Sequence, residues 1–330
     1  MLASFFFAIL ILGDDMKKLI VPIICLLCIL IVLLSVDKIT DGLMLFLNQT
    51  TTNKIEINNN DYYKSNNYIF ISNTDNFSPY GIEDILNIMY TIINSGTTDF
   101  TFYCPKEYTD CVNDMKEITK NKTLLTHLNN FVHPFNSFSS IEASISDSGE
   151  IIIKVNYLYT KEEIEKIDAK VNELINTLVT PDITEDYDKI KTIHDYIINN
   201  TKYDLENRDE TKSYTAYGPL FNGFATCNGY TDLMAIFLTK MGYDNYKVAT
   251  TEETENTTEG HVWNAVKVND EWLHLDLTWD DPVSSDGTDY LYHKYFLINS
   301  EELKTADANI TSKDHVFDEA IYSELKTTNK

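Results

Sequence analysis

Three residue types that together can carry out thiol acyl transfer lie in the second half of the chain. Cys227, His261 and Asp276 stand in the motifs ATCNGY, GHVWN and HLDLTW. A cysteine attacks a carbonyl when its thiolate is stabilised, an imidazole carries the proton, and a carboxylate orients the imidazole. The three motifs therefore predict one site, provided that the fold brings them together.

Cys227 is predicted to begin a buried helix. Apolar residues recur at helical spacing from 228 to 241, Gly242 follows as a helix stop, and the turn-rich stretch 218–223 leads into this segment. Unpaired N–H groups and the positive end of the helix dipole favour an anion at that position. A lone cysteine is more often a buried structural residue, so the functional interpretation depends on its partners.

His261 and Asp276 are predicted to meet through a β-hairpin. Two extended runs, 261–268 and 271–279, flank an Asn-Asp turn. If the turn is a two-residue loop, counting places Trp263 opposite Asp276, which makes His261 and Asp276 diagonal neighbours on one face. Such neighbours lie about 7 to 8 Å apart at Cα, within reach of an imidazole and a carboxylate.

Two other histidines lie in segments that bear on the imidazole role. His274 shares the predicted face with Asp276, but it lies two residues from the acid on the same strand, which suits it less for bridging to a thiol. His194 lies on the apolar stripe of a predicted helix, where a hydrogen-bonded core histidine is the simplest interpretation. His261 is preferred, and His274 remains the alternative.

In combination, these motifs resemble the transglutaminase-like superfamily. The resemblance covers residues 185–300 and rests on AYG, CNGY, HVWN and DLTWDDP, with HDYI and TKYD upstream. Within the superfamily the chain is most similar to a bacterial branch of the cytokinesis-protein type. Many relatives have Val or Ala before the cysteine and Gln, Glu or Ser after it, whereas this chain has Thr226 and Asn228. Neither difference removes a catalytic group.

The resemblance implies an α+β, papain-like core in which a nucleophile helix packs on an antiparallel sheet. It also implies that Cys227 is the nucleophile, His261 the general base and acid, and Asp276 the orienting carboxylate. The sequence does not identify the donor that would complement the Cys227 backbone N–H in an oxyanion hole, and Tyr217 and Asn222 are candidates.

Two functions from different classes follow. The first is an exported or membrane-anchored thiol enzyme that acts on a glutamine side chain or peptide amide of a protein or peptide substrate. The second is a catalytically weak or inactive module that binds cell-wall or surface proteins. The intact trio favours the enzyme, because a binding domain does not need all three groups. Cross-linking, hydrolysis and deamidation remain open, because they differ in whether water reaches the acyl-enzyme.

The N-terminal region predicts export. An apolar run from Leu19 to Val36 follows two lysines and is long enough to span a membrane, with the remaining chain outside the cytoplasm. No small-x-small pattern occurs near Ser35, which favours an uncleaved signal anchor over a cleaved signal peptide and a secreted product. A lipoprotein anchor at Cys28 is disfavoured by the leucine before it. Residues 1–15 are consistent with a misassigned start ahead of Met16.

The remaining cysteines and the composition limit the partners. Cys104 and Cys111 form either a short-loop disulfide or two free buried thiols. No zinc-ligand spacing surrounds them, and no cofactor is predicted. The 330 residues are 43% hydrophobic and 23% charged, which allows a sizeable core. A net charge of −25 would repel DNA or RNA, so nucleic-acid binding is disfavoured. The oligomeric state is not indicated.

The predicted organisation has five segments, namely 1–18, the apolar run 19–36, an Asn- and Thr-rich linker 37–61, a small α+β domain 62–159 and a transglutaminase-like domain 160–330. Within them, strands are predicted at 68–71, 98–103 and 295–299, a hairpin at 141–146 and 150–157, and helices at 81–93, from 160 to about 180 with a capping box, and at 185–200. The tail beyond 304 is polar and gives no assignment.

Overall fold

The computed structural model describes residues 22–23, 26, 57, 60–206, 210–250, 260–283, 290–308, 310 and 313–326. The chain divides into two units, Met1–Lys54 with Ser146–Glu150, and Ile55–Ile145 with Ile151–Lys330. The second unit contains almost all described residues. The predicted apolar run 19–36 lies almost wholly outside the described residues, as does most of the predicted linker 37–61. Among the described residues, no helix is both long enough and apolar enough to cross a membrane.

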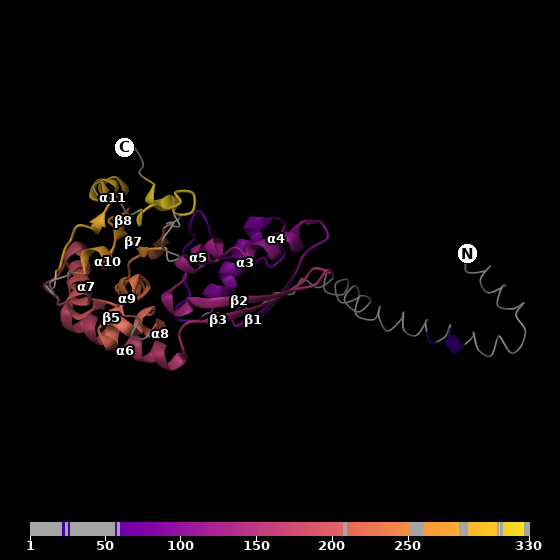
Figure 1. Ribbon diagram of the computed structural model, residues 1–330, viewed down its shortest axis with the longest axis horizontal. Helices are drawn as coiled ribbons and strands as arrows, with labels where there is room; N and C mark the ends of the chain where they lie inside the picture. Colours follow the sequence, from indigo (N-terminus) through magenta and orange to yellow (C-terminus); the bar gives the residue numbers. More distant parts are fainter. Residues whose placement is uncertain are drawn as a thin grey trace, which may run out of the picture. The chain divides into compact units, whose positions relative to one another are not determined.

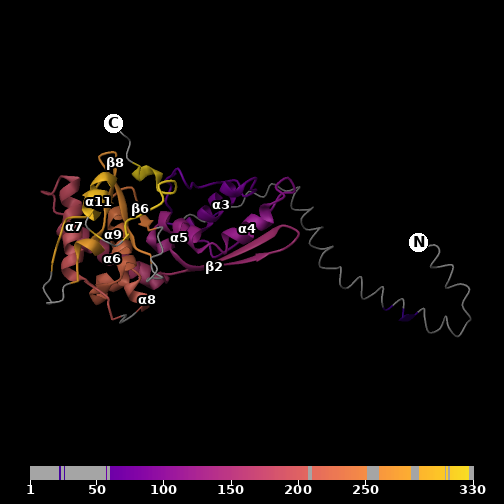
Figure 2. The same ribbon diagram turned by 45° about the horizontal axis from the view of Figure 1, so that its top comes forward.

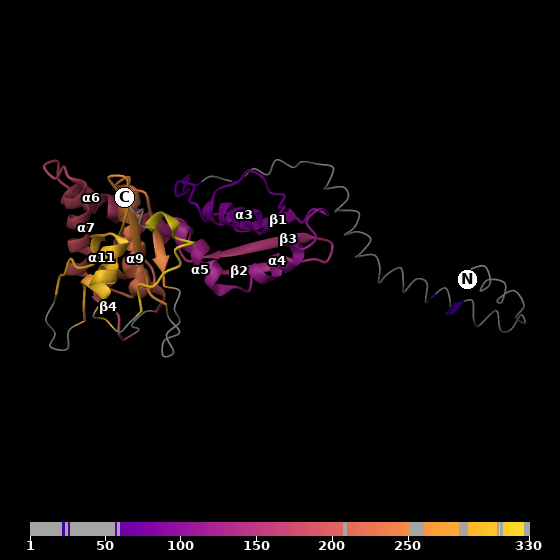
Figure 3. The same ribbon diagram turned by 90° about the horizontal axis from the view of Figure 1, so that it is seen from above.

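The region before residue 160 contains a three-stranded sheet with helices beside it (Figure 1). Its strands are β1 (Asp99–Tyr103), β2 (Phe138–Ile145) and β3 (Glu150–Tyr157), and its helices are α3 (Ile82–Asn94), α4 (Cys111–Ile118), α5 (Lys122–Phe131) and the short η1 (Pro134–Asn136). The long β2 and β3 strands, which form the predicted hairpin, run next to α3 and α4 (Figure 3). Their shared core follows from the alternation in β3, where Ile151, Ile153 and Val155 are buried.

Two details of this region settle predictions. The strand predicted at 68–71 is wrong, because the backbone bends at residues 69–70 and the Tyr68 N–H donates to the carbonyl of Ile71, in its own segment, at 3.0 Å. Both of these side chains are buried, which explains the apolar pattern. Cys104 and Cys111, also buried, form a disulfide between the end of β1 and the start of α4, so the bridged alternative is confirmed.

Three helices pack together in the remainder of the unit (Figure 2). They are α6 (Lys161–Leu178), α7 (Asp186–Asn200) and α9 (Cys227–Lys240). The predicted capping box starts α6. The Thr160 side chain accepts from the Glu163 N–H, and the Glu163 carboxylate accepts from the Thr160 N–H. The apolar stripes of α6 and α7 join the buried face of α9 in one cluster, as their spacing predicts.

A four-stranded antiparallel sheet lies against α9, in the order β6 (Asn245–Ala249), β7 (Val262–Val268), β8 (Glu271–Leu275) and β9 (Phe296–Ile298). All five residues of β6 are buried, because α9 and α5 both pack on this strand. The remaining elements are short: β4 (Lys202–Tyr203), α8 (Glu210–Ser213), η2 (Gly218–Asn222), β5 (Phe224–Ala225), α10 (Leu277–Asp280), α11 (Ser300–Asp307) and η3 (Ser323–Leu325). The predicted α+β class, with a nucleophile helix on an antiparallel sheet, is confirmed.

The β7–β8 hairpin has the predicted register over its length. Asn269 and Asp270 both have positive φ, 51° and 64°, as a two-residue hairpin loop with the twist of the sheet requires. The pairing runs from the turn as far as Asn264 opposite Leu275. The prediction that the second strand continues to residue 279 is wrong, because β8 ends at Leu275 and α10 begins at Leu277. The alternating Leu-Thr-Trp sequence suggested a strand, but it forms a helical turn.

Candidate active site

Cys227 is the first residue of α9, as predicted, and its side chain is buried. The chain enters the helix through η2 and Gly223, whose φ of 76° is a conformation that glycine adopts without strain. Gly229, in the first turn of α9, lies so close to the preceding loop that a Cβ there would be 2.3 Å from the carbonyl oxygen of Ser213. The glycine of the CNGY motif therefore allows the start of the helix to pack tightly against that loop.

Two hydrogen bonds attach the start of α9 to β7. The Thr231 hydroxyl donates to the Val262 carbonyl at 3.0 Å, and the Asn264 side-chain amide donates to the Thr231 carbonyl at 3.0 Å. Thr231 and Asn264 are both buried. Because Thr231 lies about one turn after Cys227 and Val262 directly follows His261, these bonds fix the thiol beside the imidazole.

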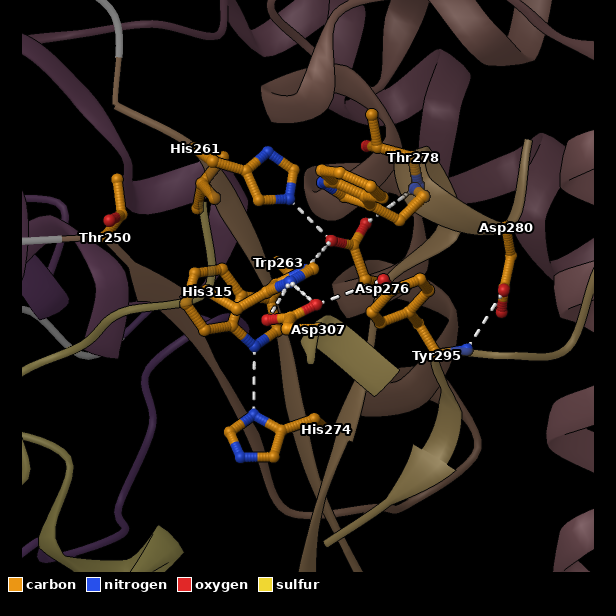
Figure 4. A network of polar contacts seen from close by, with 12 residues as sticks. Thr250, His261, Trp263, His274, Asp276, Thr278, Asp280, Tyr295, Asp307 and His315 are labelled. Carbon is orange, nitrogen blue, oxygen red and sulfur yellow. Dashed lines mark hydrogen bonds and ion pairs between the residues drawn. The ribbon is translucent and has the colours of Figure 1, made fainter. Parts of the chain in front are cut away.

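His261 and Asp276 are in direct contact. His261 Nε2 lies 2.5 Å from Asp276 Oδ2, and the other ring nitrogen points away from the acid (Figure 4). Asp276 is the N-cap of α10, and its Oδ1 accepts from the N–H groups of Thr278 and Trp279 at 2.9 and 3.2 Å. The predicted pairing of Trp263 with Asp276 is not formed, because Asp276 lies beyond β8. The cap, not a strand, turns the carboxylate toward the imidazole.

The charges in this group stabilise one another. Burial would lower the pKa of His261, but the charge and hydrogen bond of Asp276, together with the neighbouring Cys227, raise this pKa to about 10. Burial would likewise raise the pKa of Asp276, but His261 and then His315 hold it well below its usual range. An imidazolium is therefore the stable form of His261 beside the ionised acid. His261 and Asp276 are thus in direct contact, and Cys227 lies close enough to the imidazole to raise its pKa.

Sequence reasoning missed His315, which also belongs to this group. His315 Nε2 lies 2.9 Å from Asp276 Oδ2, and its Nδ1 lies 3.1 and 3.0 Å from the two carboxylate oxygens of Asp307 (Figure 4). Its side chain is buried. No periodicity surrounds His315 in the polar tail, so only tertiary contact shows its place. The role of Asp276 as the N-cap of α10 did have a signal in the sequence, since an Asp shortly before a helical turn is a common N-cap.

The other candidates for the site have separate partners. His274 Nδ1 accepts from the Trp263 indole at 3.0 Å, its Nε2 lies 3.0 Å from Ser300 Oγ, and burial lowers its pKa to about 3. Both ring nitrogens of His274 are therefore engaged away from the thiol. Of the two oxyanion-hole candidates, Tyr217 accepts from Lys166 through its hydroxyl, and Asn222 is exposed. Neither is tied to Cys227 by a hydrogen bond in the described residues.

The remaining acids of the TWDDP motif hold the surroundings in place. Asp280 Oδ1 accepts from the backbone N–H groups of Lys294 and Tyr295, at 2.8 and 3.0 Å, and so directs the chain into β9. Asp281 accepts from the Tyr230 hydroxyl at 2.5 Å and connects α9 to the end of α10. The motif therefore uses each acid for a different contact.

His194 is a buried histidine, as expected for a core residue. Its ring nitrogens lie 2.9 Å from Asp195 and 3.3 Å from Asp280. Burial would lower the pKa of His194, but these two carboxylates raise it. It contributes to the packing of α7 against α10 and does not contact the thiol through any hydrogen bond among the described residues.

Two groups in the described part of the chain have nitrogen and oxygen donors close enough together for a metal ion. One is His194, Asp195 and His293, and the other is His261, Asp276 and His315. In the first group Asp195 is also bonded to the Lys191 ammonium at 2.5 Å, and in the second the imidazoles are hydrogen bonded to carboxylates. Both groups are explained by hydrogen bonds within the protein.

An apolar pocket of about 280 Å³ lies next to the acid. Its lining is Tyr203, Leu205, Thr278, Trp279, Asp281, Pro282 and Val283. Thr278 and Trp279 are the two residues whose N–H groups bind Asp276. The first turn of α10 therefore forms part of the pocket wall and holds the carboxylate at the same time.

Comparison with known proteins finds one family model that matches part of the chain. The family model of the Transglutaminase-like superfamily matches residues 175–277. That range extends from the end of α6 to the start of α10 and includes Cys227, His261 and Asp276. The match therefore falls on the part of the chain in which the motifs predicted a transglutaminase-like core. The match does not distinguish a branch of the superfamily, so similarity to the cytokinesis-protein type stays a prediction.

The chain also has low similarity to several solved structures. A crystal structure of a TGase has 15% identity and a TM-score of 0.32, over 52% of this chain and 51% of that chain. A proposed cysteine protease from Cytophaga hutchinsonii has 14% identity and a TM-score of 0.29, over 42% and 61%. The periplasmic domain of TgpA from Pseudomonas aeruginosa, bound to ethylmercury, has 15% identity and a TM-score of 0.27, over 39% of this chain and 55% of that chain.

The chain thus spans between 51% and 61% of the length of these solved chains. No curated protein sequence matches it.

Proposed function

We propose that the protein is a thiol acyl-transfer enzyme that acts on amide bonds of protein or peptide substrates. The observation that carries this proposal is the hydrogen-bond contact of Asp276 with His261, an imidazole whose pKa is also raised by Cys227 at the start of α9. An imidazole between a fixed carboxylate and a thiol is the arrangement that draws a proton from sulfur. A module that only binds its partner has no need of this contact.

The reaction follows from the geometry. His261 Nε2 is bonded to Asp276, which leaves Nδ1 for the thiol proton. The Cys227 thiolate attacks the amide carbonyl and forms a C–S bond, and the amine or ammonia leaves with a proton from His261. Water or a second amine then attacks the thioester, loses its proton to His261 and releases the thiolate. The backbone N–H of Cys227 is one donor for the oxyanion.

The apolar pocket supports a substrate with an apolar group near the reacting amide. Its wall includes Trp279, whose backbone holds Asp276, so a side chain bound there would lie beside the site. Leu205 and Val283 are well exposed at the pocket and would be covered by such a group. The substrate class that fits is a protein or peptide, with the amide from a glutamine side chain or from the main chain.

We further propose that the described domain works outside the cytoplasm. The buried Cys104–Cys111 disulfide supports this location, since such bridges persist in oxidising compartments. The apolar sequence from Leu19 to Val36 supports it independently as a signal anchor, with secretion after cleavage as the alternative.

The test uses the full-length chain and a Cys227→Ala variant. A glutamine-rich protein is incubated with a fluorescent primary amine, and amine incorporation, ammonia release and peptide cleavage are measured in parallel. Activity in any one assay that is lost in Cys227→Ala supports the proposal, and the assay that responds identifies cross-linking, deamidation or hydrolysis. Equal activity in both proteins would place the chemistry elsewhere.

A second measurement does not need the natural substrate. The rate of Cys227 alkylation by iodoacetamide is followed across pH by mass spectrometry of the peptide that contains it, because Cys25 and Cys28 could also react. We expect reaction at acidic pH, where an ordinary thiol is inert, and loss of that reaction in His261→Ala. An ordinary thiol profile, unchanged by His261→Ala, would favour the binding module.

A further inference from the structure

One oxygen of Asp276 is shared by two imidazoles. His261 Nε2 lies 2.5 Å from Asp276 Oδ2, and His315 Nε2 lies 2.9 Å from the same atom. The triad needs only the first of these contacts. The second brings in a residue from the C-terminal tail, beyond the part of the chain that matches the superfamily.

The contacts of His315 determine its charge. Its Nε2 faces Asp276 and its Nδ1 faces both oxygens of Asp307, at 3.1 and 3.0 Å. A carboxylate only accepts hydrogen bonds, so both ring nitrogens must carry a proton, and a ring with two N–H groups is an imidazolium. Burial would lower the pKa of His315, but its hydrogen bonds to Asp276 and Asp307 raise it.

The surroundings preserve this charge. Of the described residues, the titratable groups around the ring are Asp276, Asp307, His261, Tyr295 and His274. The Tyr295 ring lies 4.8 Å from that of His315, and its hydroxyl donates to Asp307 at 3.0 Å. Trp263 and Trp279 cover the ring at 5.2 and 5.4 Å. In such a buried site, a neighbouring charge acts strongly.

We propose that His315 is a positioning residue of the site, a buried imidazolium that Asp307 keeps charged and that limits how tightly Asp276 holds the proton on His261. This inference rests on the proposed function of Cys227 and His261. It assigns His315 no contact with the substrate.

The chemical need for this residue follows from the proton's path. His261 must give its proton to the leaving amine, yet Asp276 alone stabilises the charged ring strongly. The His315 imidazolium on the same carboxylate oxygen offsets part of the negative charge of Asp276 and repels the His261 imidazolium. The proton on His261 therefore becomes easier to transfer. The repulsion is mutual, because the charge of His261 lowers the pKa of His315 in turn. His315 also fixes the direction of Oδ2, as Thr278 and Trp279 fix Oδ1.

The experiment measures His261 through its effect on Cys227. Iodoacetate carries a negative charge that an imidazolium attracts, so its rate of reaction with Cys227 should fall as His261 loses its proton at high pH. The full-length chain, His315→Gln and Asp307→Asn are compared from about pH 5 to about pH 11, which brackets the pKa of His261. The peptide containing Cys227 is quantified by mass spectrometry. Iodoacetamide, which is neutral, serves as the reference reagent.

The falling limb is the pH range over which the iodoacetate rate decreases. We expect both variants to move it to higher pH by about one unit, because each removes the positive charge of His315 next to Asp276. His315→Gln can still donate a hydrogen bond to Asp276, so a shift in this variant reports the charge. Asp307→Asn leaves His315 in place and touches neither Asp276 nor His261. His127→Gln is the matched control, because His127 is a buried imidazole bonded to Tyr322, and it should leave the limb unchanged.

The outcomes separate the two proposals. A falling limb in the wild type that stays in place in both variants would overturn the role of His315 and leave the enzyme proposal standing. A shift in His315→Gln without one in Asp307→Asn would overturn the role of Asp307 in keeping the ring charged. An ordinary thiol profile in the wild type would instead contradict the proposed function. Thermal unfolding of each variant confirms that it is folded, and a purely structural clamp would lower stability without moving the limb.

Discussion

At the scale of single residues, Asp276 has two functions that are normally separate. One oxygen caps the N-terminus of α10 and the other contacts two imidazoles, so each oxygen has two partners within the protein. A side chain bonded in this way has little freedom to rotate. The orientation of His261 therefore depends on the backbone of α10.

Substitution of Asp276 can separate these two functions. Asp276→Asn keeps an acceptor for the α10 N–H groups but removes the charge, and we expect kcat/KM to fall by about 10³- to 10⁴-fold, as for other triads. Asp276→Ala removes the cap as well and should lose about 1 kcal/mol of stability in addition. Amine incorporation and urea unfolding measure the two effects. Full activity in Asp276→Asn would mean that the charge is not used.

The raised pKa of His261 predicts how stability depends on pH. A group whose pKa is higher in the folded than in the unfolded protein adds stability that is complete below its unfolded pKa, about 6.5, and is lost as pH rises through the folded value, about 10. Wild type should therefore exceed His261→Gln in unfolding free energy near pH 6, by on the order of a few kcal/mol, and the gap should narrow by pH 10. Urea titrations across this range test the sign, and a widening gap would contradict it.

At the scale of elements, two side-chain hydrogen bonds set the position of the thiol. Thr231 and Asn264 connect α9 to β7 directly beside Cys227 and His261. The sheet supplies the imidazole and the helix supplies the sulfur, so a small slide between the two elements would separate the reacting atoms.

Thr231→Val should uncouple these elements while keeping the side-chain shape. The variant leaves the Val262 carbonyl without its buried donor, at about 1 to 3 kcal/mol, and we expect a loss of kcat/KM beyond what partial unfolding explains. Thr239→Val is the control, since Thr239 lies at the other end of α9 and accepts a hydrogen bond from Asn245. Equal activity losses per unit of lost stability in the two variants would show that the α9–β7 contact has no special role.

The sequence predicts those elements that local rules determine. The Asn-Asp turn determines the β7–β8 register, the apolar spacing predicts α6, α7 and α9, and Thr160 with Glu163 gives the start of α6. Local rules fail where a tertiary contact decides. Leu277 to Trp279 alternate like a strand but follow an N-cap, and His315 is 39 positions from the acid it binds. The candidate triad was therefore predictable from its motifs, whereas the group that supports it was not.

At the scale of the whole unit, the core crosses the boundary that was predicted at residue 160. Tyr68 and Phe131 both pack with Tyr246 from β6, and Phe131 also packs with Tyr322 from the tail, in one continuous aromatic cluster. The Tyr322 hydroxyl accepts from the Ala249 N–H and so attaches the tail to the sheet. The division into domains at 159 and 160 stays a prediction, but burial of this kind favours cooperative unfolding.

Removal of the disulfide tests this coupling. The bridge closes a loop with a sequence separation of 7, and Cys104→Ala with Cys111→Ala should lower the free energy of unfolding by about 2 to 3 kcal/mol. Because the bridge lies before residue 160 and Cys227 lies in α9, activity at low temperature should remain. Far-UV circular dichroism and the alkylation of Cys227 should report one shared, lowered midpoint. Two separate midpoints would show that the regions unfold independently.

The first turn of α10 connects recognition to reactivity. Thr278 and Trp279 line the apolar pocket, and their backbone N–H groups donate to Asp276. A substrate group that fills the pocket would therefore contact Thr278 and Trp279, the two residues that orient Asp276 and, through it, His261. A substrate that fits the pocket well would keep the first turn of α10 in place, and one that fits poorly would leave the turn mobile. The protein would therefore select between substrates through kcat as well as through binding affinity.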